Sequence, residues 1–370
     1  MSTAIEFLLN PDITYLNHGS YGATPKKILD EQRRWQQKME EEPVQFMHEI
    51  RPPALEKSRE DLSHFLGVQK EEIFFVHNAT QGVFMVAQQR IKKGMKVVCT
   101  SHRYQAVYHT LHYLCTKAQA QLEIIEIPFG VHTKDDLTQT IIEQVPNDCD
   151  LFFLDEISSA SAMRFPVSDV CEFLKKRSPS IEIVIDGAHS PGHVQTNFSN
   201  VDYWTGNLHK WLCAPKGVAA LYVSQSNLEN IHAPIISHGY NQGLAQEMEW
   251  MGTHDPSAIL CTPTVLELHE ELGGVEFRKR NHMLMQWARK EICNAFPHFI
   301  TDPSIDGLAM CSFILPFKEK LYQSLFHEHQ IEIFVNPWGD KLVLRISCMS
   351  AYNKKSDYKH LIQALYTLGY

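Results

Sequence analysis

Two side chains stand out for their chemistry because each follows an apolar, strand-like run. Asp186 ends the run IEIVI and is followed by Gly187 and, three residues on, by His189. Lys210 comes 24 residues after Asp186, between a histidine and a tryptophan. Burying an ammonium group is costly, so a lysine in an apolar setting needs an explanation. A desolvated amine of lowered pKa could form an imine with a carbonyl compound, whereas a lysine extending from a surface loop is the structural alternative.

A third motif follows another strand-like run. Residues 78–82 (NATQG) lead into an apolar helical stretch, where backbone N–H groups and the Thr80 hydroxyl could hold a phosphate group. The simpler alternative is that Thr80 only caps the helix. Asp186 has two readings as well: it caps a turn, or it faces the ring nitrogen of a pyridoxal cofactor and keeps that ring protonated as an electron acceptor.

The elements that would position these residues alternate between helices and strands. Helical patterns are expected over 25–42 and 52–66, and short apolar runs recur between helical stretches from about residue 72 to 223. Such a pattern indicates a mostly parallel sheet with both faces covered, in a doubly wound α/β domain. Ligands of these sheets bind outside the carboxyl ends of the strands, which is where Asp186 falls.

A different pattern begins past about residue 255, where long helical segments come first. Three strand-like pieces follow them, at about 308–315, 330–336 and 341–348. This succession indicates a separate, smaller α+β unit. We therefore predict a large α/β domain over 16–250 and a small α+β domain over 251–370, which the N-terminal arm 1–15 joins.

The composition restricts the class of protein. The chain has 370 residues and a formal net charge of -9, which argues against non-specific nucleic-acid binding. Its nine cysteines are scattered singly without a C-x-x-C pair, as is usual in a reducing compartment. No run approaches the length of a membrane span and no signal peptide is apparent, so we predict a cytoplasmic protein. The 20 histidines show no zinc-site spacing, and no metal site is predicted.

Motifs spread over essentially the whole chain resemble the class V aminotransferase family of pyridoxal-phosphate (PLP) fold type I, and most closely its isopenicillin N epimerase-like branch. The most specific are DGAH at 186–189 and TGNLHKWL at 205–212. The others occur in the expected order, at 15–22 (YLNHGSYG), 78–80 (NAT), 252–257 (GTHDPS), 345–347 (RIS) and 352–353 (YN). The resemblance implies an aspartate aminotransferase-like fold with a large, mostly parallel-sheet domain and a smaller C-terminal α+β domain.

The resemblance also implies roles at the cofactor, pyridoxal 5'-phosphate. Lys210 would hold the cofactor as an imine and move the α-proton of the substrate. Asp186 would pair with the ring nitrogen, and His189 would lie near the ring and its phenolic oxygen. Tyr104 would stack on the ring, with a packed core tyrosine as an equal alternative. The remaining implied cofactor contacts are Ala79, Thr80, Ser159, Asn207, His209, Gly252 and Thr253.

Substrate and partner contacts follow from the same resemblance. Arg345 would bind the carboxylate of an amino acid substrate through paired hydrogen bonds, with a structural salt bridge as the alternative. Asn17, His18 and Tyr21 would line the substrate entrance. The segment 252–253 is similar to one that reaches the phosphate of the neighbouring subunit in related proteins, which implies a homodimer with shared active sites.

The reaction itself stays open, because the protein decides which bond at the α-carbon breaks. The resemblance favours an epimerase or racemase, with transamination also possible, and the alternative is a C–S lyase or a cysteine desulfurase-like enzyme. A persulfide mechanism is disfavoured because residues 316–344 contain no cysteine. An epimerase needs a second acid opposite Lys210, for which Tyr104 and His18 are the candidates. A catalytically inactive binding protein of this fold is a further alternative, against which the joint presence of Lys210 and Asp186 argues.

Overall fold

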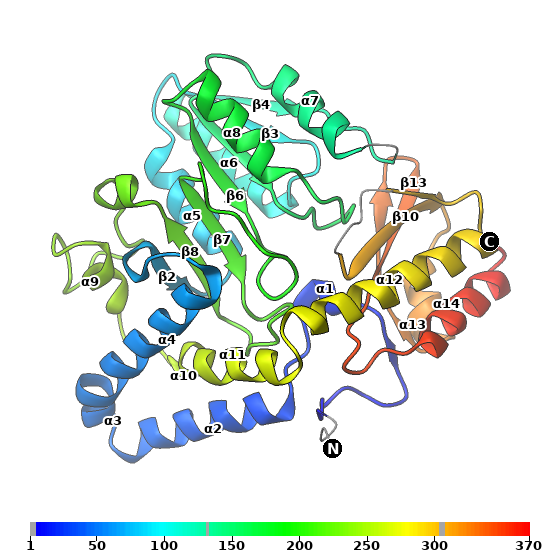
Figure 1. Cartoon of the computed structure of the whole chain (residues 1–370), viewed down its shortest axis with the longest axis horizontal. Helices are drawn as coiled ribbons and strands as arrows, with labels where there is room; N and C mark the ends of the chain where they lie inside the picture. Colours follow the sequence, from blue (N-terminus) through cyan, green and yellow to red (C-terminus); the bar gives the residue numbers. More distant parts are fainter. Residues whose placement is uncertain (1–4, 131–132, 303–307) are drawn as a thin grey trace.

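The computed structural model describes residues 5–130, 133–302 and 308–370. Its central layer is a seven-stranded sheet in the order β2-β8-β7-β6-β5-β3-β4 (Figure 1). Strand β8 runs antiparallel to both of its neighbours, and every other pair in the sheet is parallel. The strands are β2 (Ile73–Val76), β3 (Lys96–Thr100), β4 (Gln121–Ile125), β5 (Leu151–Asp155), β6 (Glu182–Asp186), β7 (Tyr203–Asn207) and β8 (Ala219–Val223). The mostly parallel sheet that the apolar runs predict is confirmed.

Helices cover both faces of this sheet because its strands are apolar on both sides. In β2, Phe74 and Val76 enter one core with α5 (Ala79–Arg90) and α6 (Gln105–Ala118). The alternate residues Ile73 and Phe75 enter a second core with α7 (Lys134–Gln144) and α8 (Val167–Arg177). Successive side chains of a strand point to opposite faces, so a continuous apolar run requires cover on both.

A second, smaller sheet lies beside the large one. It is antiparallel, in the order β12-β13-β10-β9, and α12, α13 and α14 lie around it (Figure 1). Its core contains side chains from β10, β13, α12 and α14. The elements are α12 (Val275–Ala295), β9 (Ile300–Thr301), β10 (Met310–Pro316), α13 (Leu321–His327), β12 (Phe334–Trp338), β13 (Lys341–Ser347) and α14 (Lys355–Thr367).

The N-terminal segment connects the two units. Strand β1 (Thr14–Tyr15) pairs in parallel with β11 (Ile331–Glu332) of the C-terminal unit. The chain then enters the short helix α1 (His18–Tyr21) and passes to the other end of the molecule. Residues 15–22 therefore lie between the large sheet and the small one, where the segment can contribute to a site that both units form.

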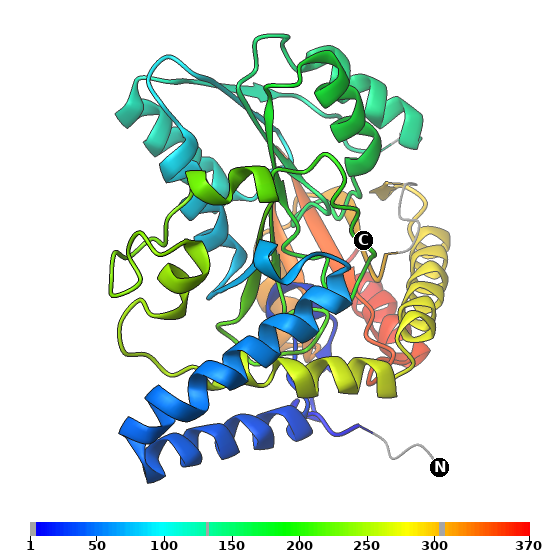
Figure 2. The same cartoon turned by 60° about the vertical axis from the view of Figure 1, so that its left-hand side comes forward.

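A helical layer packs beside the large sheet, as Figure 2 shows for α2, α4 and α11. The helices predicted over 25–42 and 52–66 are confirmed as α2 and α4. Side chains of α11, such as Val265, belong to the same core as the seven-stranded sheet, and the predicted boundary near residue 250 stays a prediction. The elements are α2 (Lys26–Glu41), α3 (Pro43–Gln45), a π-helical turn (Phe46–Ile50), α4 (Arg51–Leu66), α9 (Leu244–Glu249), α10 (Ser257–Leu260), α11 (Thr262–Glu271) and two 3-10 turns (Lys70–Glu72, Gln225–Asn230).

Across the described residues, no helix is long and apolar enough to cross a lipid bilayer.

Candidate active site

A cavity of about 740 Å³ opens at the carboxyl ends of the parallel strands. Asp155 of β5, Asp186 of β6 and Asn207 of β7 line it, together with the start of α5. Lys210 lines it from the loop that follows β7. A cavity therefore lies at the edge of the parallel sheet where ligands of such sheets bind.

Lys210 is buried, and its amine is held against an imidazole. Its Nζ lies 3.1 Å from Nε2 of His189. Burial and, after it, the positive charge of Arg345 lower the pKa of Lys210 to about 7 against the opposing charges of Asp186 and Asp155. At neutral pH a large share of the amine is therefore unprotonated, which is the form that attacks a carbonyl carbon.

The loop that carries Lys210 is fixed from both sides. Leu208, Trp211 and Leu212 of this loop are buried in the cores. On the other side the N-terminal segment approaches closely at Gly22, where a β-carbon would lie 2.0 Å from the carbonyl oxygen of His209. Gly22 also has a φ of +68°, a conformation that favours glycine. The YLNHGSYG motif thus contains a glycine because its backbone packs directly on the lysine loop.

Asp186 and His189 form the wall opposite this loop. The Asp186 carboxylate accepts a hydrogen bond from the N–H of Ala188 at 2.9 Å. His189 is fully buried, and burial followed by the Lys210 charge lowers its pKa well below the usual value, so the ring is neutral. Its Nδ1 has no hydrogen-bond partner within the described part of the chain. A buried ring nitrogen without a partner is a site for a ligand atom.

The start of α5 forms the end of the cavity that suits a phosphate. Asn78 caps this helix by accepting a hydrogen bond from Gln81 N–H, and Ala79 N–H donates to Asn207 Oδ1 at 2.9 Å. Thr80 lines the cavity as predicted. Burial lowers the pKa of His209 to about 4, so this ring is neutral and the positive end of the helix dipole is the main attraction for an anion there.

Arg345 is a buried cation that lies behind the cavity wall. Strand β13 directs its guanidinium to the Ser159 carbonyl oxygen, to Ser20 Oγ at 2.9 Å and to Asn17 Oδ1 at 3.3 Å. These three residues line the cavity, and Phe334 covers the guanidinium at 4.4 Å from the ring centroid. Burial lowers the pKa of Arg345 to about 10, and no ion pair with an acidic residue is found for it in the described ranges. Its hydrogen-bond partners are neutral, and Arg345 itself is absent from the cavity wall among the residues described.

Two tyrosines of the predicted set lie on the cavity wall. The Tyr104 side chain is 45% exposed and that of Tyr21 is 71% exposed, and both line the cavity. Tyr104 is therefore not a packed core tyrosine. Its ring is free to contact a ligand held between Lys210 and Asp186.

His18 differs from the expectation that it lines the entrance. It is fully buried and is absent from the cavity wall among the residues described. Its Nε2 lies 2.9 Å from the Lys210 carbonyl oxygen and its Nδ1 lies 2.7 Å from the Tyr352 hydroxyl, and burial lowers its pKa to about 3. The physical reason is that both ring nitrogens are occupied, one by the backbone of the lysine loop and the other by the Tyr352 hydroxyl.

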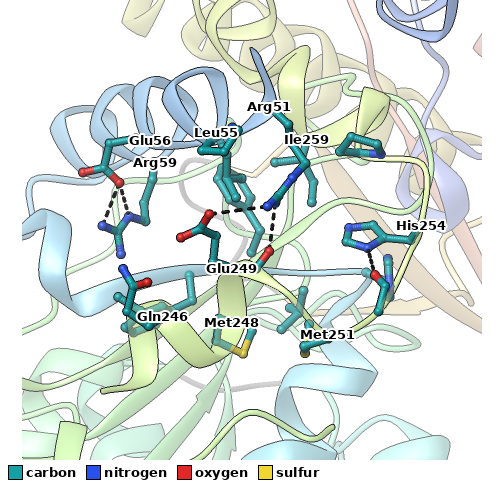
Figure 3. A pocket seen from close by; sticks show the side chains of 18 of the residues that line it. Arg51, Leu55, Glu56, Arg59, Gln246, Met248, Glu249, Met251, His254 and Ile259 are labelled. Carbon is teal, nitrogen blue, oxygen red and sulfur yellow. Dashed lines mark hydrogen bonds and ion pairs between the residues drawn. The ribbon is translucent and has the colours of Figure 1, made fainter. Parts of the chain in front are cut away.

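Gly252 and Thr253 lie apart from the cavity of their own chain. They line a neighbouring cavity of about 620 Å³ between α4, β2 and α9, which Figure 3 shows. Arg51 is buried there, donating to the Glu249 carbonyl oxygen at 2.8 Å and forming an ion pair with the Glu249 carboxylate at 3.4 Å. His77 lines both cavities, so the two adjoin. Among the residues described, Gly252 and Thr253 are not part of the cavity that Thr80 lines.

Several cavity residues were missed by the sequence analysis. Asp155 lies within the run DLFFLDEI and ends strand β5, and the rule that selected Asp186 applies to it equally. Glu332, Phe334 and Tyr322 reach the cavity from the C-terminal unit. No local signal marks these three, because Glu332 on β11, Phe334 on β12 and Tyr322 on α13 reach the site only through the packing of the C-terminal unit.

Comparison with known proteins agrees with this geometry. The family model for aminotransferase class-V matches residues 14–359. A probable L-cysteine desulfhydrase, chloroplastic, of Arabidopsis thaliana is 28% identical over 96% of this chain and 83% of its own. An isopenicillin N epimerase of Streptomyces clavuligerus is 25% identical over 97% of this chain and 95% of its own. A solved complex of the cystine C-S lyase C-DES with cysteine persulfide shares the fold, with a TM-score of 0.83 at 18% identity over 96% of this chain and 97% of that one.

The site fits the cofactor of this family. Lys210 supplies an amine, Asp186 a carboxylate, His189 a ring nitrogen without a partner, and α5 a positive helix end. The chain therefore belongs to the class V aminotransferase family and is a pyridoxal 5'-phosphate-dependent enzyme of fold type I.

Proposed function

We propose that this enzyme cleaves the C–S bond of cysteine or of a cysteine conjugate by β-elimination. The overall reaction consumes the amino acid and water and yields a thiol or sulfide, pyruvate and ammonium. The observation that carries the proposal concerns the two buried candidates for an acid/base. The Lys210 amine lines the cavity, whereas His18, the second candidate, has both ring nitrogens in hydrogen bonds. Elimination needs only one such group, which removes the α-proton and then protonates the departing sulfur.

The chain's own residues can carry the steps in order. The bound cofactor supplies electron withdrawal from the α-carbon. Arg345, with Asn17 and Ser20, would hold the substrate carboxylate and orient the α-carbon toward Lys210. Because the pKa of Lys210 is lowered to about 7, its amine can accept the α-proton and release it again near neutral pH.

Cysteine desulfurase chemistry by a persulfide receives no support from the thiols. In the described part of the chain all nine cysteines are free, and eight of them are buried. The exception, Cys293, is half-buried on α12. Cys213 lies three residues from Lys210, and burial raises the pKa of its thiol to about 12, so it is not a thiolate at neutral pH.

Epimerisation is a second candidate, and the position of Tyr104 favours it. An epimerase needs a second proton donor on the face opposite Lys210, and Tyr104 places a half-exposed phenol at the cavity. The isopenicillin N epimerase relatives keep this candidate open at the same level of similarity as the desulfhydrases. Only the products can separate the two reactions.

The test is one incubation with three readouts. The holoenzyme is given L-cysteine, S-alkyl cysteines, cysteine sulfoxides and a panel of D- and L-amino acids in deuterated water. We expect pyruvate in equal amounts with sulfide from L-cysteine, with a thiol from S-alkyl cysteines and with a sulfenic acid from cysteine sulfoxides. Deuterium exchange or inversion at the α-carbon without pyruvate would reject elimination in favour of epimerisation, and a keto acid that retains the side chain would indicate transamination.

We also propose a homodimer in which residues 252–253 serve the partner's cofactor site. Their separation from Lys210 in the single chain supports this arrangement, since they line the adjoining cavity. Ile235 lines the same cavity and is 54% exposed, as expected of a side chain that a second subunit covers. The cytoplasmic location stays a prediction.

A further inference from the structure

A second buried carboxylate lies directly beside Asp186. The parallel pairing of β5 with β6 matches Asp155 with Asp186 at the carboxyl ends of the two strands. Neighbouring strands are about 4.8 Å apart, and matched residues point to the same face. Both residues line the cavity that contains Lys210, and their exposed fractions are only 4% and 7%. The two carboxyl groups therefore share one wall with little access to water.

The groups around Asp155 differ from those around Asp186. The carboxyl of Asp155 accepts a hydrogen bond from the Tyr104 N–H, and no ion pair is found for it among the described residues. Arg103 and Lys210 are the cations whose charges act on Asp155. The Arg103 guanidinium lies over the Tyr108 ring instead, 4.6 Å from the ring centroid. The Asp186 carboxylate accepts a hydrogen bond from the Ala188 N–H. It also interacts more strongly with the Lys210 charge than Asp155 does.

Two ionised carboxylates cannot both be stable on this wall. Burial raises the pKa of Asp155 well above the usual value, and the charge of Asp186 is the next largest cause. Burial also raises the pKa of Asp186, but the Ala188 N–H and Lys210 oppose the rise. A pair of this kind titrates as a unit and holds one proton over a wide pH range. The surroundings favour that proton on Asp155.

We propose that Asp155 and Asp186 form a proton-sharing pair in which Asp155 is a neutral acid at working pH while Asp186 stays an anion. Neutral Asp155 has two consequences. Its O–H can donate a hydrogen bond to an anionic oxygen of the bound cofactor, and it adds no second negative charge that would keep Lys210 protonated. Asp155 is thus a positioning residue for the proton on Lys210, whichever bond at the α-carbon breaks.

Infrared difference spectroscopy on the full chain tests the pair directly. Aspartates are labelled with ¹³C, which separates them from the buried Glu156, and spectra are taken on the apoprotein and the holoenzyme. We expect the C=O band of a protonated aspartate at neutral pH in the wild type. Asp155→Asn should abolish the band, whereas Asp186→Asn should keep it, because burial is the largest cause of the raised Asp155 pKa and remains in that variant. A wild type without the band, a band that survives in Asp155→Asn, or a band that is lost in Asp186→Asn would overturn the proposal.

The titration of Lys210 gives a second, independent readout. The rate at which the apoprotein forms an imine with PLP is followed by absorbance across pH. Asp155→Asn removes no charge if Asp155 is neutral, so the midpoint should stay where it is in the wild type. Asp186→Asn removes an anion and should lower the midpoint. An equal lowering by both substitutions would show that Asp155 is an anion and reject the proposal.

Asp155→Leu tests the hydrogen-bond donor. The asparagine amide can still donate, whereas leucine cannot, so PLP binding to the apoprotein should weaken roughly tenfold or more in the leucine variant relative to the asparagine variant. Equal affinities in two folded variants would show that Asp155 donates no hydrogen bond to the cofactor.

Discussion

The two adjoining cavities are similar in volume but opposite in their electrostatics. In the cavity next to α4, the buried cation Arg51 is paired with Glu249, and Trp250 covers it at 5.1 Å. At the cavity at the strand ends, Arg345 lies behind the wall with only neutral partners, and the pKa of the wall residue Lys210 is lowered to about 7. The comparison indicates that buried charges without an ionic partner, rather than cavity volume, identify the reactive site. A buried charge is costly without a partner, and a bound ligand of opposite charge can supply one.

Lys210→Ala should produce the largest effect. Without the amine, neither the imine nor the proton transfer is available, and kcat should fall by about 10³-fold or more in the reaction assay. Lys216→Ala is the matched control, because Lys216 lies six residues away and donates to Gly22 and Thr24 outside this cavity. Comparable losses from both substitutions would mean that the effect is structural.

Arg345→Lys should come next. A lysine cannot reproduce the planar pair of hydrogen bonds to a carboxylate, so KM for the amino acid should rise roughly 10- to 100-fold with the cofactor still bound. The same exchange in the paired cavity, Arg51→Lys, should lower thermal stability but change KM little. If Arg51→Lys raised KM as strongly, the contrast between the two cavities would not hold.

The acid sensitivity of the fold provides a third comparison. Burial lowers the pKa of His18 and of His193 to about 3, so below the usual value near 6.5 the unfolded chain binds protons that the native state does not. Stability is full above pH 6.5 and falls as the pH drops toward 3, by about 1.4 kcal/mol per pH unit for each histidine. Denaturant unfolding of His193→Gln at pH 7 and pH 5 should show a smaller loss than wild type, and an equal loss would remove His193 from this account.

Subunit complementation should give the smallest signal. Lys210→Ala and Thr253→Asp homodimers are each expected to be inactive, the second because a carboxylate would repel the phosphate. After the two proteins are mixed and reassociated, about a quarter of the sites should combine intact Lys210 and intact Thr253 from different chains and recover activity. Reassociation without recovery would place Thr253 at the site of its own chain.

The sequence predicts the sheet, its edge and the residues that follow its strands, because these depend on local apolar runs and strand ends. Asp155 was accessible by the same rule and was overlooked. Glu332 and Tyr322 could not be predicted, since they reach the cavity through the C-terminal unit. The family resemblance placed His18 at the entrance, but its ring is buried against the lysine loop, which only the packing reveals.

The central claim is that Lys210 carries the cofactor. Reducing the holoenzyme with borohydride converts its imine to a stable secondary amine, and mass spectrometry of the digested protein locates the modified lysine. We expect the phosphopyridoxyl group on the peptide containing Lys210 and on no other. Its presence on a different lysine, or an unmodified Lys210 in fully loaded and reduced enzyme, would contradict the account.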